Sequence, residues 1–283
     1  MKSFARLWLL PLAVALICAI AVWMFIRGHF FVVSGNAMCP YAVDGDVVRT
    51  ESPKNINRGD ILLINNPLYT DNKEHLSLQR CVAMPGDKVQ IFHKRLYVND
   101  ILQNSDYCSF DIKMLFLSAT EKKSAVKIYN LIPDNEPLAN TVYVLPETKY
   151  QKIVSDSILK HVEKCVLAPY LYDSRLFPFS HLFTWNKDYY GPIVVPFKGM
   201  KIKLNTMNYV FYKFLFDQGS EAKLECIDNK FYVDGKVSDT YTFCHDYYYL
   251  LNDYRDDTSD SRSYGPISNE CIKARVTQVF LHL

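Results

Sequence analysis

The side chains with nucleophilic or ionisable chemistry gather in short motifs along the chain. The first motif reads Ser34-Gly35-Asn36-Ala37-Met38-Cys39-Pro40 and offers a hydroxyl and a thiol. A second contains Gln79, Arg80 and Cys81 and leads into Pro85-Gly86-Asp87. Cleavage of an amide bond by such groups needs a nucleophile beside a base that can accept its proton. The chemistry available to this chain therefore depends on which residues occupy the nucleophile position and the base position.

In their order along the chain, these motifs resemble those of the type I signal peptidases, which are membrane-bound serine endopeptidases. The resemblance covers about residues 1–100 and 185–283 and implies the fold of that family. The matching segments, besides the one that ends at Pro40, are Arg58-Gly59-Asp60-Ile61, Arg80–Val89, Leu96-Tyr97-Val98-Asn99, Tyr241-Thr242-Phe243, Asn252-Asp253-Tyr254-Arg255 and Ser259–Gly265.

The family reaction uses a serine hydroxyl beside a lysine whose pKa is lowered by burial. The resemblance places the serine position on Ala37 and the lysine position on Gln79. A methyl group cannot attack a carbonyl, and an amide cannot accept a proton at a useful pH. Because loss of the nucleophile alone costs on the order of 10⁶ in turnover, the sequence predicts that no intact catalytic residue remains.

The rest of the motifs is expected to support the site or to shape its scaffold. Ser261 matches the family serine that supports the lysine, so we expect it to bond the Gln79 amide. Tyr41 and Asn252-Asp253-Tyr254-Arg255 depart from the family's Thr and Gly-Asp-Asn-Arg. The expected site-support residues are Gly35, Met38, Pro40, Arg80 and Ser261, and the expected scaffold residues are Gly59, Asp60, Pro85, Gly86, Asp87, Asp253, Arg255, Asp260 and Arg262.

Cys39 is the alternative nucleophile. On an extended strand it shares a face with Ala37 about 6.6 Å further along, whereas Ser34 faces the other side. Cys81 has the same offset from Gln79, which permits a Cys39–Cys81 disulfide or redox pair. Two small buried thiols are the favoured interpretation, because cysteine is among the most buried residue types.

The first residues of the chain predict a membrane anchor. Residues 8–26 are nineteen consecutive uncharged residues, and a helix of that length is about 28 Å long, close to the ~30 Å of a bilayer core. Lys2 and Arg6 favour an N-terminus in the cytoplasm. A cleaved signal peptide is the less favoured alternative, since no small-residue cleavage site follows. The resemblance implies a body on the outer, periplasmic face of the cytoplasmic membrane.

Apolar and polar residues then alternate with a period of two, which is typical of half-buried strands. The fold class is therefore expected to be mainly β: an antiparallel body with an inserted α/β cap. The expected organisation is a cytoplasmic segment 1–7, a transmembrane helix 8–26, a body 27–104 and 197–283, and a cap 105–196. Expected strands are 43–49, 61–65, 88–92, 96–99, 201–204, 223–227, 230–234, 240–243, 247–251 and 275–281, with helices over 148–162 and 205–216.

Composition and residue spacing argue against several classes of binding partner. The formal charge is +2, with 32 basic and 30 acidic residues spread along the chain, and without a basic stripe we expect no nucleic acid. Cysteine and histidine spacings predict no metal, and no cofactor is expected. Two functions remain: a non-catalytic homologue that binds a signal peptide, an exported preprotein or an active paralogue, and an active peptidase with Cys39 as nucleophile.

Overall fold

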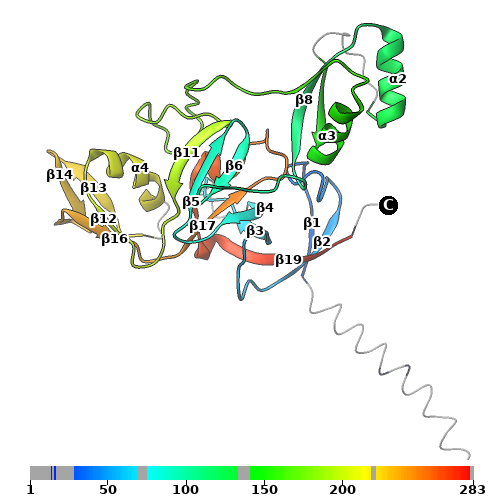
Figure 1. The fold of residues 1–283 in the computed structure, drawn as a ribbon. Helices are drawn as coiled ribbons and strands as arrows, with labels where there is room; N and C mark the ends of the chain where they lie inside the picture. The colour runs from blue at the N-terminus through cyan, green and yellow to red at the C-terminus, as the bar shows by residue number, and fades with distance from the viewer. Residues whose placement is uncertain are drawn as a thin grey trace, which may run out of the picture.

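The computed structural model describes residues 14, 16, 29–68, 75–132, 141–217 and 221–280 and is mainly β (Figure 1). The fold class predicted from the sequence is confirmed in this respect. The predicted transmembrane helix 8–26 lies outside the described residues except for Val14 and Leu16. Among the described residues, no helix combines the length and apolar character that crossing a bilayer requires.

The centre of the molecule is a seven-stranded antiparallel sheet with the order β1-β2-β19-β3-β4-β17-β18. Its strand β3 is buried at four successive residues, Ile61 to Ile64, as expected for an apolar run in the middle of a sheet. The strands are β1 (His29–Val32), β2 (Val47–Glu51), β3 (Ile61–Asn65), β4 (Leu76–Ala83), β17 (Tyr247–Leu251), β18 (Ile267–Ser268) and β19 (Ile272–Phe280).

A four-stranded sheet with the order β11-β5-β6-β7 packs beside it. A tight turn at His93-Lys94 joins β5 to β6 as a hairpin, and both residues have positive φ. β11 comes from the segment expected to form the cap, yet it pairs with β5. The strands are β5 (Lys88–Phe92), β6 (Arg95–Val98), β7 (Ile101–Leu102) and β11 (Tyr189–Val194).

Two smaller lobes extend from opposite ends of this core in Figure 1. The cap lobe is a sheet of order β10-β8-β9 with two helices packed on it. Its elements are β8 (Ser109–Leu115), α2 (Ala119–Tyr129), β9 (Thr141–Pro146), α3 (Glu147–Asp156) and β10 (His161–Lys164). The distal lobe holds β12 (Lys201–Lys203), α4 (Thr206–Asp217), β13 (Leu224–Ile227), β14 (Lys230–Val233), β15 (Lys236–Val237) and β16 (Thr240–Thr242).

The helix predicted over 148–162 is correct only in its first part. α3 ends at Asp156 because Ser157 adopts a left-handed conformation with φ of 54°. The rest of the predicted range leads into β10, where Val162 pairs with Met114 of β8. The apolar spacing that indicated one long helix therefore belongs to a helix and a strand that bury side chains in the same core.

Candidate functional site

The motif from Ser34 to Tyr41 forms a turn, and this corrects the strand geometry assumed from the sequence. β1 ends at Val32, and the Met38 carbonyl accepts the N–H groups of Tyr41 and Ala42 at 2.8 and 3.1 Å. Gly35 has φ of +78°, a conformation that favours glycine. Because the chain turns here, Ser34 does not face away from Ala37, and both line one pocket.

The pocket beside Ala37 has a volume of about 60 Å³. Ala37 itself is half-buried, and its carbonyl accepts the Tyr254 N–H at 2.9 Å. Met38 is 2% exposed and belongs to the core beneath the pocket. The lining is apolar apart from a few small polar groups: Phe31, Val33, Ser34, Gly35, Ala37, Met38, Leu76, Ser77, Leu78, Asn252 and Ser259.

Gln79 lies on β4 opposite Leu62 of β3, and its side chain is fully buried. Its Nε2 donates to the Ser259 carbonyl at 2.7 Å. Ser261, the expected partner, accepts the Leu250 N–H at 3.0 Å instead. Ser259 also lines the pocket beside Ala37. The two positions expected to match the family's catalytic pair are therefore connected through one residue of the 252–262 segment.

Arg80 follows Gln79 and fixes β4 to that segment. Its Nε and Nη2 donate to the two carboxylate oxygens of Asp253 at 2.8 and 2.6 Å, and its Nη1 donates to the Gly59 carbonyl at 3.0 Å. The guanidinium also lies 4.3 Å from the Tyr107 ring centroid. Burial lowers the pKa of Arg80, but the bonded Asp253 outweighs burial and raises it. Such a bidentate pair fixes both position and orientation.

The 252–262 segment is held internally by a second buried ion pair. Arg262, 1% exposed, donates through Nε and Nη2 to the Asp260 carboxylate at 2.9 and 2.6 Å. Its Nη1 donates to the Arg255 carbonyl at 2.6 Å. Asp260 also accepts the Arg262 N–H and so begins the short helix α5 (Ser261–Tyr264). These bonds set the position of the Ser259 carbonyl that Gln79 reaches.

The same segment fastens the cap lobe to the body. Ser109 at the start of β8 donates its N–H to the Asp253 carbonyl and accepts the Arg255 N–H, both at 2.9 Å. The Ser109 hydroxyl donates to the Cys39 carbonyl at 2.7 Å. Asp256 lies between Lys94 and Lys187, and its Oδ2 accepts the Asp111 N–H at 2.8 Å. The motifs alone did not indicate Lys94, Lys187 or Asp256 as part of the site.

Asp87 organises the turn between β4 and β5. Its carboxylate accepts from the Met84 N–H at 2.7 Å, the Arg58 guanidinium at 2.8 Å and the Asn99 amide at 2.7 Å. Burial raises the pKa of Asp87, but these donors outweigh burial and hold it below its ordinary value. Gly86, with φ of +87°, turns the chain after Pro85. Nearby, the Gly59 N–H donates to the Cys81 carbonyl, and the Cys81 N–H donates to the Asp60 carbonyl.

The cysteines of the described residues are free thiols, Cys39 and Cys81 among them. Burial raises the pKa of Cys39, and it raises that of Cys81 to about 12. Both thiols therefore remain protonated at neutral pH, and a protonated thiol is a weak nucleophile. Cys39 also lies in a turn, so the shared strand face that suggested it as a nucleophile is absent.

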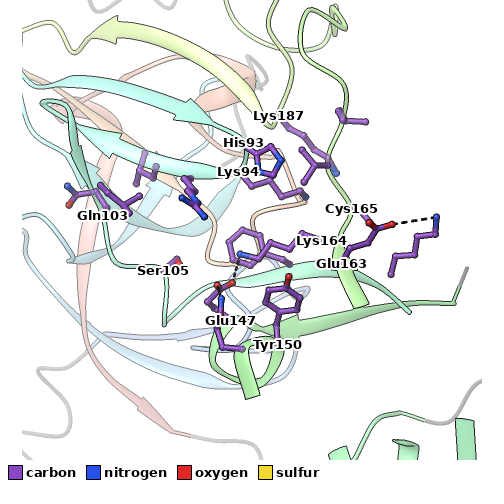
Figure 2. A pocket seen from close by; sticks show the side chains of 18 residues that line it. His93, Lys94, Gln103, Ser105, Glu147, Tyr150, Glu163, Lys164, Cys165 and Lys187 are labelled. Carbon is purple, nitrogen blue, oxygen red and sulfur yellow. Dashed lines mark hydrogen bonds and ion pairs between the residues drawn. The ribbon is translucent and has the colours of Figure 1, made fainter. Parts of the chain in front are cut away.

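A much larger cavity lies elsewhere, between the β5–β6 hairpin and the cap lobe (Figure 2). Its volume is about 740 Å³, and Lys94, Lys164 and Lys187 line it together with Glu147 and Glu163. The Lys164 ammonium pairs with Glu147 at 2.5 Å. Neither Ala37 nor Gln79 lines this cavity.

Comparison with known proteins agrees with the motifs. Residues 5–155 match the family model described as "Signal peptidase, peptidase S26". Signal peptidase IB of Staphylococcus aureus is 27% identical over 158 residues, which cover 53% of this chain and 74% of that protein. Signal peptidase I of Streptococcus pneumoniae is 29% identical over 115 residues, which cover 40% of this chain and 52% of that protein. The chain belongs to the signal peptidase family, peptidase S26.

Replacement of Asp87 by asparagine is expected to reduce the free energy of unfolding at neutral pH. It should also make that free energy fall less steeply as the pH becomes acidic. Because the folded-state pKa is lowered, the stabilisation from Asp87 is present above its unfolded pKa of about 3.9 and is lost as pH falls through the folded pKa. Denaturant unfolding over a pH series measures this. The exposed Asp106→Asn change is the control, and equal acid slopes for wild type and Asp87→Asn would contradict the assignment.

Proposed function

We propose that this chain is a non-catalytic member of its family that binds an extended peptide of an exported preprotein, such as its signal peptide, in the pocket beside Ala37. The observation that carries the proposal is a small pocket, sized for one side chain, whose wall at position 37 is a methyl group. The pocket walls from β1 and β4 are present and apolar, while the atom that would attack a carbonyl is missing.

The base position supports the same conclusion. The buried Gln79 amide already donates to the Ser259 carbonyl, and an amide has no lone pair that accepts a proton near neutral pH. Loss of a nucleophile and its base together leaves only the contribution of substrate binding. Binding without turnover suits a protein that holds a signal peptide or an exported protein, or that regulates an active paralogue.

The edge of the main sheet supports binding of an extended segment. β1 is the terminal strand of the seven-stranded sheet, and Phe31 and Val33, in β1 and directly after it, line the pocket. An exposed edge strand accepts a peptide through main-chain hydrogen bonds, and neighbouring pockets select alternate side chains. A pocket of about 60 Å³ suits a small side chain.

The second function is cleavage with Cys39 as a relocated nucleophile. It would require deprotonation of a thiol whose pKa is raised by burial. Ser109 lies beside Cys39, but its hydroxyl bonds the Cys39 carbonyl and is no base. This second function would be supported only if the unmodified chain cleaves a preprotein and thiol alkylation stops the cleavage.

We also propose that residues 8–26 anchor the chain in the cytoplasmic membrane, with the N-terminus inside and the body on the outer face. The uncharged run and Lys2 and Arg6 before it support this orientation. Protease added to intact spheroplasts should digest the body, whereas disrupted cells are needed to digest a tag placed before Lys2. Full protection of the body in spheroplasts would reverse the proposed topology.

A variant with Ala37→Ser and Gln79→Lys is expected to cleave an exported preprotein that the wild type leaves intact. The new lysine would be buried at a fully enclosed position, where its pKa falls and its neutral amine becomes a base. Detergent-solubilised full-length protein is incubated with preprotein, and processing is followed on a gel. Ala37→Ser with Gln79→Met is the matched control, since it has the hydroxyl without the base.

Cleavage by the unmodified chain would contradict the proposed loss of activity. In that case thiol alkylation decides between nucleophiles, because only a cysteine mechanism stops after alkylation. Correct folding of each variant is checked by its unfolding transition, so that inactivity of the double variant is read as a failed site and not as a failed fold.

Ser34→Trp is expected to weaken peptide binding about tenfold or more, a change of about 1.4 kcal/mol or more. Ser34 is exposed and lines the pocket, so an indole there fills the space that a peptide side chain would take. Fluorescence anisotropy with a labelled signal peptide measures the affinity. Ser52→Trp, at another exposed serine outside the pocket, should bind as wild type; equal affinities for both variants would place the binding site elsewhere.

A further inference from the structure

Buried and partly buried cations cluster where the body meets the cap lobe, and nearly all of them have a carboxylate partner. Arg80 pairs with Asp253, and Arg262 pairs with Asp260. Lys94 and Lys187 share Asp256, and Lys94 also lies 3.4 Å from Asp188. Buried charges need such partners, because transfer of an ion out of water costs several kcal/mol.

Arg255 is the exception among the described residues of this cluster. It is 8% exposed and forms no ion pair in the described structure. Its Nε donates to the Cys108 Sγ at 3.1 Å, and its Nη1 is buried without a hydrogen-bond partner. An arginine cannot relieve this cost by losing its proton, since its pKa stays above about 12 in proteins.

The Cys108 thiol does not supply the missing negative charge. Cys108 is 1% exposed, and its pKa is raised by burial although Arg255 lowers it in part. The thiol is therefore neutral at physiological pH and accepts only a weak hydrogen bond. Asp253 acts on Arg255 electrostatically, but both oxygens of its carboxylate are bonded to Arg80, so Arg255 has no carboxylate of its own.

Arg255 lines a small, partly open cavity of about 10 Å³. That volume holds a single water molecule or an ion of similar size. Positive groups dominate the walls, and Asp188 is the one acidic residue among them. The lining residues are Ile91, Lys94, Leu96, Lys187, Asp188, Leu251, Arg255 and Arg262.

The small cavity adjoins the large open one drawn in Figure 2. Lys94, Leu96 and Lys187 line both. The larger cavity, with a volume of about 740 Å³, has Lys94, Lys113, Lys164 and Lys187 in its lining, and such charges raise the local concentration of anions. Arg255 therefore lies next to a cavity whose lining lysines attract anions.

We propose that this cavity is a structural site for one small monovalent anion of the chloride class, which accepts a hydrogen bond from the Arg255 Nη1. A water molecule would satisfy the N–H but leave the charge uncompensated, whereas a monovalent anion does both. The volume excludes sulfate and phosphate, and the nearby Asp188 carboxylate disfavours a second negative charge. The site is independent of the function proposed for the Ala37 pocket.

The test compares thermal unfolding of the full-length protein in detergent with chloride, bromide or gluconate at equal ionic strength. A bound anion raises the Tm of the folded state by mass action, and about 5 °C is expected at a concentration ~100-fold above the dissociation constant. Chloride and bromide should stabilise and gluconate should not. Arg255→Met should abolish the difference between these salts.

Arg95→Met is the matched control, because Arg95 is an exposed arginine on the wall of the large cavity only. It removes the same charge and should retain the wild-type response to chloride. Equal responses of wild type to chloride and gluconate, or an unchanged chloride response in Arg255→Met, would overturn the proposal.

Crystals of the wild-type protein grown with bromide provide a measurement that does not depend on any variant being folded. An anomalous peak within hydrogen-bond distance of the Arg255 Nη1 supports the site. A water at that position, with no anomalous signal, overturns it.

Discussion

The bidentate ion pair between Arg80 and Asp253 is the contact on which the rest of the site depends. It joins the central strand β4 to the 252–262 segment across the sequence. Tyr254, the next residue, holds the Ala37 carbonyl, and the Asp253 and Arg255 backbones hold Ser109 of the cap lobe. The turn at Ala37, the strand of Gln79 and the cap therefore take their positions from one short segment.

Charged pairs hold this frame, whereas the two positions proposed to match the family's catalytic pair carry no charge. Removal of Asp253 would leave Arg80 as a partly buried charge without its carboxylate partner; the cost reaches about 3–5 kcal/mol where both members of such a pair are fully buried. Ala37 and Gln79 carry no charge, and the Gln79 amide satisfies its N–H with a carbonyl already fixed by Arg262 and Asp260. Neither Ala37 nor Gln79 takes part in the ion pairs that hold this frame together.

Strand boundaries were predicted correctly where a run of apolar residues is bounded by turn-forming residues. β3, β5 and β17 have the expected boundaries, because their apolar runs are bounded by clear turns. β4 was not among the expected strands, since Ser77, Gln79 and Arg80 interrupt its apolar pattern. The end of α3 depends on the left-handed Ser157, a conformation that serine adopts only when its surroundings favour it.

The contacts of the site were less predictable than its residues. The motifs located Ala37, Gln79, Arg80, Asp253 and Arg262, but the partner of Gln79 is a backbone carbonyl, which every residue carries. Ser261 had the right side chain, yet its hydroxyl is used by the Leu250 N–H. The Lys94–Asp256 pair spans 162 positions of sequence, so only the folded topology brings its members together.

The attachment of the cap lobe has a mechanical consequence. Ser109 is bonded through its main chain to the 252–262 segment and through its hydroxyl to the Cys39 carbonyl, two residues beyond Ala37. A load applied to the cap, such as the pull of a tethered protein, is therefore transmitted to the turn at Ala37 through short, directional bonds. The cap lobe and the pocket wall are thus mechanically coupled, so tension on the lobe changes the shape of the wall.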